Sequence, residues 1–185
     1  MPVNSTFAYS FVIGGCNPTK PDTYQNYLFN IAVATKNLRE LGASADIVTL
    51  LQLSQDAGES KLENIAEVNL QKRMGVRVYA IPPQASGKES FYRTQLDKFR
   101  ILSLTEYDRI LFMDGDIMPL SNLDYLFEMS SNGTLQENVV VQGIYEPANG
   151  GFFMLRPTGV ADIQRVIERR EESANILEHP HFDPI

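Results

Sequence analysis

The sequence predicts an α/β fold in which a largely parallel sheet lies between helices. Short runs of β-branched and other apolar residues alternate along the chain with longer segments whose apolar residues recur at helical spacing, and this alternation is typical of such folds. Gly42 and Gly75 follow two of the helical segments, where a glycine suits the end of a helix. The length of 185 residues is close to the roughly 150 of an average domain, so we expect a single domain over residues 1–185.

The first part of the chain is expected to supply three strands and two helices. Gly14-Gly15 should close the first strand, and Pro82-Pro83 should end the third, because a proline cannot donate to a strand ladder. The expected elements are, in order, a strand over 8–13, a helix over 24–41, a strand over 45–51, a helix over 60–74 and a strand over 76–81. The residues expected to face inward are Leu28, Ile31, Ala32, Thr35 and Leu38 on the first helix and Leu62, Ile65, Ala66 and Leu70 on the second.

The second part of the chain is centred on one apolar strand. Residues 109–113 read RILFM, a continuous run typical of a strand that is buried on both faces. Ser121 is a suitable N-cap for the helix that follows this strand. The expected elements are a helix over 91–104, a strand over 109–113, a helix over 121–129, strands over 139–142 and 152–155, and a helix over 158–172.

Composition restricts the class of protein. Sixteen Lys and Arg residues against 23 Asp and Glu residues give a net charge of −7, which argues against a protein that grips nucleic acid. One cysteine, Cys16, excludes an internal disulfide and a multi-cysteine zinc site. No apolar run approaches the roughly 20 residues of a membrane span. The N-terminal apolar stretch has no preceding Lys or Arg, so it favours a strand over a signal peptide, and we expect a cytoplasmic protein.

The chemically most suggestive motif is Asp114-Gly115-Asp116, directly after the RILFM strand. Ligands of α/β sheets bind beyond the carboxyl ends of the strands. Two carboxylates this close are costly unless a positive charge compensates them, and Mg²⁺ and Mn²⁺ prefer such oxygen ligands. Gly115 would leave room for the close approach of a ligand. The alternative is an ordinary surface turn, since Asp and Gly both favour turns.

Three stretches of the sequence carry a resemblance to a known family. Lys98-Phe99-Arg100, residues 106–117 (EYDRILFMDGDI) and residues 122–127 (NLDYLF) together closely resemble the nucleotide-sugar-dependent glycosyltransferases of the glycogenin and galactinol synthase family, glycosyltransferase family 8. A lysine sixteen positions before the first aspartate recurs in that family, and the form DGDI is similar to the galactinol synthase branch. Residues 149–157 (NGGFFMLRP) resemble its Asn-x-Gly-x-Met-x-x-x-Pro segment, and residues 8–12 resemble its first strand, where uracil binds.

The resemblance implies a GT-A fold, which is Rossmann-like, and transfer of a hexosyl group from a UDP-sugar with retention of configuration. It also implies Mn²⁺ or Mg²⁺ as cofactor and an unidentified acceptor (a sugar, a polyol or a protein), with the assembly state open, a homodimer included. Carried over residue by residue, the implied site consists of Asp114 and Asp116 as metal ligands, Lys98 and Asn149 as catalytic residues, and Val12, Asp114, Gly115, Asn149 and Gly151 as donor-binding residues.

The sequence departs from the family in two places. Gly14-Gly15-Cys16-Asn17 replaces the family's usual turn after the first strand, and the late histidine that completes the family's metal shell has no match. His179 and His181 stand too soon after Asn149 to be that residue, so we hypothesise an N-terminal fragment or a truncated form. Two other functions stay open: a non-catalytic nucleotide-sugar-binding unit, and a phosphatase of the haloacid dehalogenase type, in which the first aspartate of Asp-x-Asp is a nucleophile.

Individual residues also have simpler interpretations. Lys98 could be a solvated lysine on a helix, and Asn149-Gly150-Gly151 could be a plain hairpin turn. Tyr24 is expected to pack at the start of the first helix rather than against a base. Asp124 is expected to form a cap or a structural hydrogen bond rather than to take part in catalysis.

Overall fold

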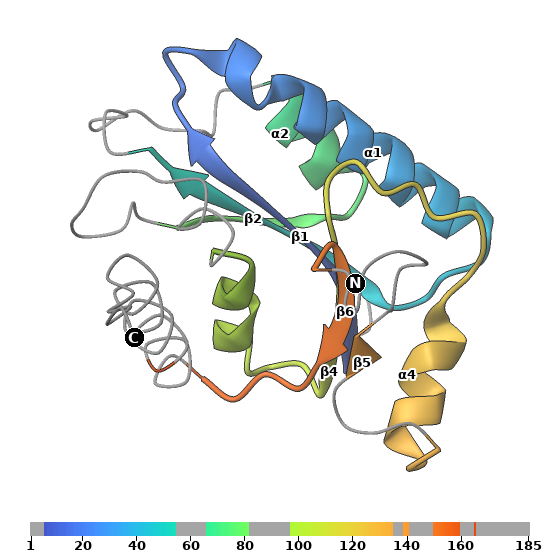
Figure 1. Ribbon diagram of the computed structural model, residues 1–185. Coiled ribbons are helices and arrows are strands. Elements are labelled where there is room, and N and C mark those ends of the chain that lie inside the picture. Colours follow the sequence, from blue (N-terminus) through green and yellow to red (C-terminus); the bar gives the residue numbers. More distant parts are fainter. Residues whose placement is uncertain are drawn as a thin grey trace, which may run out of the picture.

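A six-stranded sheet with helices on both faces forms the protein (Figure 1). The structure is a computed structural model that describes residues 6–54, 66–81, 97–134, 139–140, 150–159 and 165. Its strands are β1 (Phe7–Cys16), β2 (Asp46–Leu53), β3 (Arg77–Ile81), β4 (Arg109–Met113), β5 (Val139–Val140) and β6 (Phe152–Leu155). Its helices are α1 (Gln25–Glu40), α2 (Ala66–Arg73) and α4 (Asp124–Ser131), with 3₁₀ helices η1 (Pro21–Thr23) and η4 (Asp97–Ser103). The predicted α/β fold with a mostly parallel sheet is confirmed.

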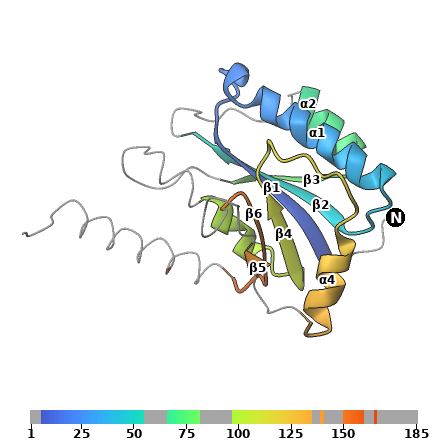
Figure 2. The same cartoon turned by 45° about the vertical axis from the view of Figure 1, so that its right-hand side comes forward.

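The sheet has the strand order β3-β2-β1-β4-β6-β5. The first four strands in this order are parallel, whereas β6 is antiparallel to β4 and β5 is antiparallel to β6. The chain therefore moves outward from β1 to β3 and then returns to the other side of β1 with β4. Because parallel crossovers are right-handed, this reversal places the two sets of helices on opposite faces. Accordingly, α1 and α2 lie side by side over one face, and η4 lies on the other (Figure 2).

The alternation of side chains along the central strands fills both layers. One apolar layer lies between the sheet and α1 (the α1 layer), and the other lies between the sheet and η4 (the η4 layer). On β1, Tyr9 and Phe11 point into the α1 layer, and Ala8 points into the η4 layer. On β4, Leu111 joins the α1 layer and Phe112 joins the η4 layer, so the apolar run is buried on both faces as predicted. Among the described residues, no helix is long and apolar enough to cross a membrane.

Several predicted elements are confirmed and others are corrected. Helix α1 agrees with its prediction within one residue at each end, all five of its expected inward residues are buried, and Tyr24 packs at its start with 1% exposure. Gly42 and Gly75 have φ values of 83° and 80°, as expected for glycines that end helices. Gly14-Gly15 does not close the first strand, because β1 continues past an irregularity in register to pair Cys16 with Leu53.

Three further corrections concern helices. The described part of the helix predicted over 91–104 is the 3₁₀ helix η4. Ser121 does not cap α4, which begins three residues later, where the Asn122 side chain accepts a hydrogen bond from the Asp124 N–H at 2.9 Å. On α2 the expected Ala66 is exposed, and the buried positions are Val68 and Gln71. Gln71 is buried although it is polar, because its Nε2 donates a hydrogen bond to the carbonyl of Leu28 on α1 at 3.0 Å. Most of the helix predicted over 158–172 lies outside the described residues.

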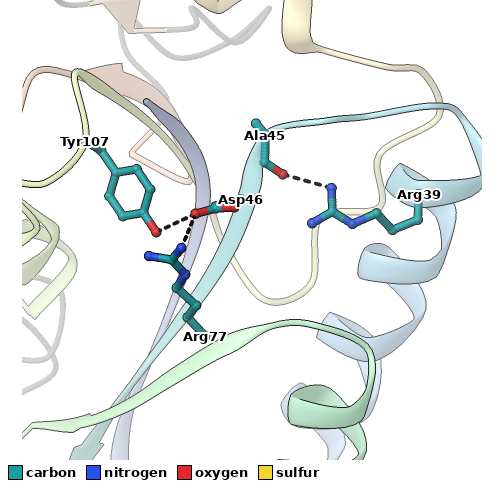
Figure 3. Close-up of polar contacts among 5 residues, drawn as sticks. All are labelled: Arg39, Ala45, Asp46, Arg77 and Tyr107. Carbon is teal, nitrogen blue, oxygen red and sulfur yellow. Dashed lines mark hydrogen bonds and ion pairs between the residues drawn. The ribbon is translucent and has the colours of Figure 1, made fainter. Parts of the chain in front are cut away.

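A polar cluster joins the amino ends of β2 and β3 to the segment that precedes β4 (Figure 3). Asp46, the first residue of β2, accepts a hydrogen bond from the Tyr107 hydroxyl at 3.1 Å and pairs with Arg77 of β3 at 2.9 Å. Burial, followed by the charge of Asp46, raises the pKa of Tyr107 above its usual value. Nearby, Arg39 donates to the carbonyls of Ala43 and Ala45, each at 2.8 Å. This cluster lies at the edge of the sheet opposite the carboxyl end of β4.

Candidate functional site

The acidic triplet lies where the order of the strands reverses. The first crossovers run from β1 toward β3, and the chain then returns to β4 on the other side of β1, so the carboxyl ends of β1 and β4 flank the switch point of the sheet. Ligands of open α/β sheets bind at such a point. Asp114 directly follows β4, and its N–H donates to the carbonyl of Gly151 at 2.8 Å. The Ile117 N–H closes a turn onto the Asp114 carbonyl at 3.0 Å, which leaves Asp116 exposed within that turn.

Lys98 of η4 reaches this turn from the opposite layer. Its Nζ lies 3.1 Å from Oδ1 and 3.3 Å from Oδ2 of Asp114, and it donates to the Gly150 carbonyl at 3.1 Å. It also stands 5.5 Å from the centroid of the Phe112 ring. The Lys98 side chain is only 14% exposed, against 35% for Asp114. The simpler interpretation of Lys98 as a solvated helix lysine is therefore wrong.

Gly115 packs against α1 rather than facing open space. A Cβ added to it would lie 3.3 Å from Cδ1 of Tyr27 and 3.7 Å from Cδ1 of Ile31. The expectation that Gly115 leaves room for a ligand is corrected here, because α1 side chains fill the direction in which its side chain would project. The glycine lets the turn that carries both aspartates lie directly on α1.

The close contact at Gly115 leads to a prediction about stability. Gly115→Ala should lower the free energy of unfolding by about 1 kcal/mol, because the added methyl group overpacks the contact with Tyr27. Urea unfolding would measure this change. Gly150→Ala is the matched control, since a Cβ there meets nothing within 4 Å. The loss should largely disappear in a Tyr27→Ala background, and an equal loss with and without Tyr27 would show that this contact is not the cause.

The remaining predicted residues have mixed outcomes. Val12, on β1, is half-buried and packs in the η4 layer, together with Phe99 next to Lys98. Gly151 is buried and contributes the carbonyl that accepts from Asp114. Asn149, His179 and His181 lie outside the described residues.

The carboxylates fit a hard divalent cation as a partial shell. Asp114 and Asp116 supply oxygen ligands on one exposed turn, and within the described ranges no group of three His, Cys, Asp or Glu side chains comes together. Mg²⁺ and Mn²⁺ are commonly held by one or two carboxylates and take their other ligands from water and substrate phosphates. The donor set therefore suits such an ion and does not form a closed cage.

Asp124, Tyr9 and Ser44 form a polar anchor at the far end of the segment that begins with the acidic triplet. Residues 114–123 run along α1 from β4 to α4 (Figure 1), where Asn37 contacts the Met118 sulfur at 3.2 Å. At the end of the segment, Asp124 accepts from the Tyr9 hydroxyl at 2.6 Å and from the N–H and hydroxyl of Ser44 at 2.6 and 2.8 Å. Asp124 thus has the structural role expected for it.

The anchor shifts the pKa values of both of its acidic groups. Burial acts to raise the pKa of Asp124, but the hydrogen bonds from Tyr9 and Ser44 outweigh it and hold that pKa below its usual value. Burial and the hydrogen bond to Asp124 raise the pKa of Tyr9. Sequence reasoning missed these partners, which lie 80 and 115 residues from Asp124 and leave no local signal.

The chain is similar in sequence to plant enzymes that act on or make sugars, although no family model matches it. It is 30% identical over 135 residues to UDP-glucuronate:xylan alpha-glucuronosyltransferase 1 of Arabidopsis thaliana, which covers 70% of this chain and 19% of that protein. It is 27% identical over 107 residues to galactinol synthase 10 of the same plant, covering 58% of this chain and 32% of that protein. The chain thus spans about a fifth to a third of the length of these relatives.

A solved structure shows the same fold. The glycosyltransferase GlyE of Streptococcus pneumoniae TIGR4 superposes with a TM-score of 0.52 at 18% identity, covering 98% of this chain and 41% of that one. This likeness supports the GT-A type of fold. The chain is thus a homologue of the xylan glucuronosyltransferases and the galactinol synthases, and the predicted resemblance to the galactinol synthases is confirmed.

Proposed function

We propose that the chain is the nucleotide-sugar-binding part of a metal-dependent, retaining glycosyltransferase, which transfers a hexosyl group from a UDP-sugar to an acceptor. One observation supports this most directly. Lys98, Asp114 and the backbone of Gly150 and Gly151 gather at the switch point beside β4, so a carboxylate suited to a cation, an ammonium suited to an anion and two backbone carbonyls meet in one place. The xylan relatives are named as UDP-glucuronate-dependent glucuronosyltransferases, which supports a UDP-sugar as the donor.

Each residue has a part in this proposal. Asp114 and Asp116 would hold Mn²⁺ or Mg²⁺, which when bound supplies Lewis-acid stabilisation of the charge on the departing diphosphate. Lys98 supplies a further positive charge near the donor, in a place with little access to water. Gly151, and Asn149 two residues before it, would line the sugar pocket. Val12 would border the nucleoside, and retention of configuration follows the family resemblance.

A panel of UDP-sugars incubated with Mn²⁺ tests the proposal. We expect Mn²⁺ together with UDP to raise the melting temperature, and one sugar of the panel to give UDP release with a matching mass change on the acceptor or the protein. Asp116→Ala should lose the Mn²⁺-dependent part of both signals, because half of the carboxylate pair is gone.

The other outcomes of the panel are also informative. UDP binding without any release would indicate a non-catalytic binding unit. Hydrolysis of phosphate monoesters that Asp114→Asn abolishes, with no turnover of any UDP-sugar, would replace the glycosyltransferase proposal with the phosphatase.

A further inference from the structure

The ammonium group of Lys98 takes the place that a cation would take on Asp114. It contacts both carboxylate oxygens, and its third partner is the Gly150 carbonyl. A lysine ammonium has three N–H donors, so these three acceptors within 3.3 Å can satisfy all of them. The carboxylate of Asp114 is therefore already neutralised by a charge that belongs to the chain.

A divalent cation that binds Asp114 must weaken the ion pair between Lys98 and Asp114. An ion on the same carboxylate would stand within a few ångströms of the Lys98 ammonium, and like charges at such distances repel strongly where solvent is scarce. With 14% of its side chain exposed, Lys98 is poorly screened by water. Cation binding must therefore displace the ammonium or share the carboxylate with it.

We infer that Lys98 acts as a placeholder cation, which neutralises Asp114 in the nucleotide-free chain and gives the carboxylate up only when a nucleoside diphosphate is present. This inference rests on the proposed function, because the diphosphate supplies the negative charge to which the displaced ammonium can turn. The metal then binds weakly on its own and more tightly with the nucleotide, and by linkage the nucleotide gains the same factor from the metal.

Displacement of Lys98 need not disturb the turn that it leaves. The Asp114 N–H remains bonded to the Gly151 carbonyl, and Gly115 remains packed on α1. The two aspartates thus keep their place on the turn while their charge partner changes. The contrasting view is that Lys98 only ties η4 to β4, in which case its removal would lower stability without raising the affinity for metal.

The test is a titration with Mn²⁺ alone, with free Mn²⁺ followed by electron paramagnetic resonance. Lys98→Met should bind Mn²⁺ about tenfold more tightly than the parent chain, because the competing charge is gone. Lys98→Arg keeps the charge and should retain the weak affinity of the parent. Lys36→Met is the matched control: it removes the same charge from an exposed pair with Glu40, whose side chains are 67% and 63% exposed. Lys98→Gln serves as a second neutral variant if Lys98→Met does not fold by circular dichroism.

The outcomes separate this inference from the proposed function. Unchanged, weaker or undetectable Mn²⁺ binding in the neutral Lys98 variants overturns the placeholder role, and so does an equal gain in Lys36→Met. A parallel titration with UDP at saturating Mn²⁺ addresses the proposed function, which fails if the parent chain binds no UDP. The gain in Mn²⁺ affinity that UDP produces should be smaller in Lys98→Met than in the parent, since less repulsion is left to relieve.

Discussion

Replacement of Asp114 by asparagine should abolish Mn²⁺-dependent UDP binding and lower any sugar transfer by about 100-fold or more. The asparagine keeps the size of the side chain and one oxygen, but it removes the charge that would hold the cation. Asp114 is also the residue that Lys98 pairs with, so the variant removes the carboxylate for which the Lys98 ammonium and the proposed cation compete. Isothermal titration with UDP, with and without Mn²⁺, measures the first effect, and the rate of UDP release measures the second.

Asp108→Asn is the matched control for this change. Asp108 precedes the same strand at its opposite end, where it is exposed and its N–H donates to the Thr6 carbonyl at 2.7 Å. The chemical change and the change in net charge are the same, but the position is far from the triplet along β4. Equal losses in the two variants would point to overall charge rather than to the site.

Replacement of Asp124 by alanine should cost about 3 kcal/mol of unfolding free energy, the largest loss of stability that we expect for any single polar side chain. The variant leaves the fully buried Tyr9 hydroxyl without its acceptor and removes both hydrogen bonds from Ser44. A buried donor left without a partner costs roughly 1–3 kcal/mol, and lost hydrogen bonds to a charged group add to it. Urea unfolding measures the change.

A double-mutant cycle with Tyr9→Phe tests the cause. The second substitution removes the orphaned hydroxyl, so the double variant should be more stable than the sum of the two single losses predicts. Strict additivity would contradict a direct coupling between Tyr9 and Asp124.

The same anchor gives a pH dependence with a definite sign. Hydrogen bonds hold the pKa of Asp124 below its unfolded value, so the anchor stabilises the fold fully above about pH 4. Its contribution falls as the pH drops through the lower pKa of the folded state. The stability difference between the parent chain and Asp124→Ala should therefore shrink below about pH 4. A difference that grows on acidification would reverse the sign of the proposed linkage.

Local patterns were sufficient for much of the architecture. The RILFM run predicted β4 to the residue, because a strand buried on both faces needs apolar side chains at every position. The spacing of apolar residues predicted α1, and the glycine after it predicted where it ends. The prediction was less successful on α2, where the buried Gln71 donates a hydrogen bond to a backbone carbonyl of α1. A pattern of apolar residues cannot predict the burial of a polar side chain.

For the candidate site, the sequence by itself identified the candidate residues: two aspartates directly after a buried strand, and a lysine sixteen positions before the first of them. Only the tertiary structure decided which groups meet there. The order of the strands brings the turn at Gly150 and Gly151 to the end of β4, places Lys98 on both oxygens of Asp114, and sets Gly115 against Tyr27. The physical reason is that each of these contacts depends on how distant segments pack across the sheet. Periodicity describes the faces of single elements and carries no information about their neighbours.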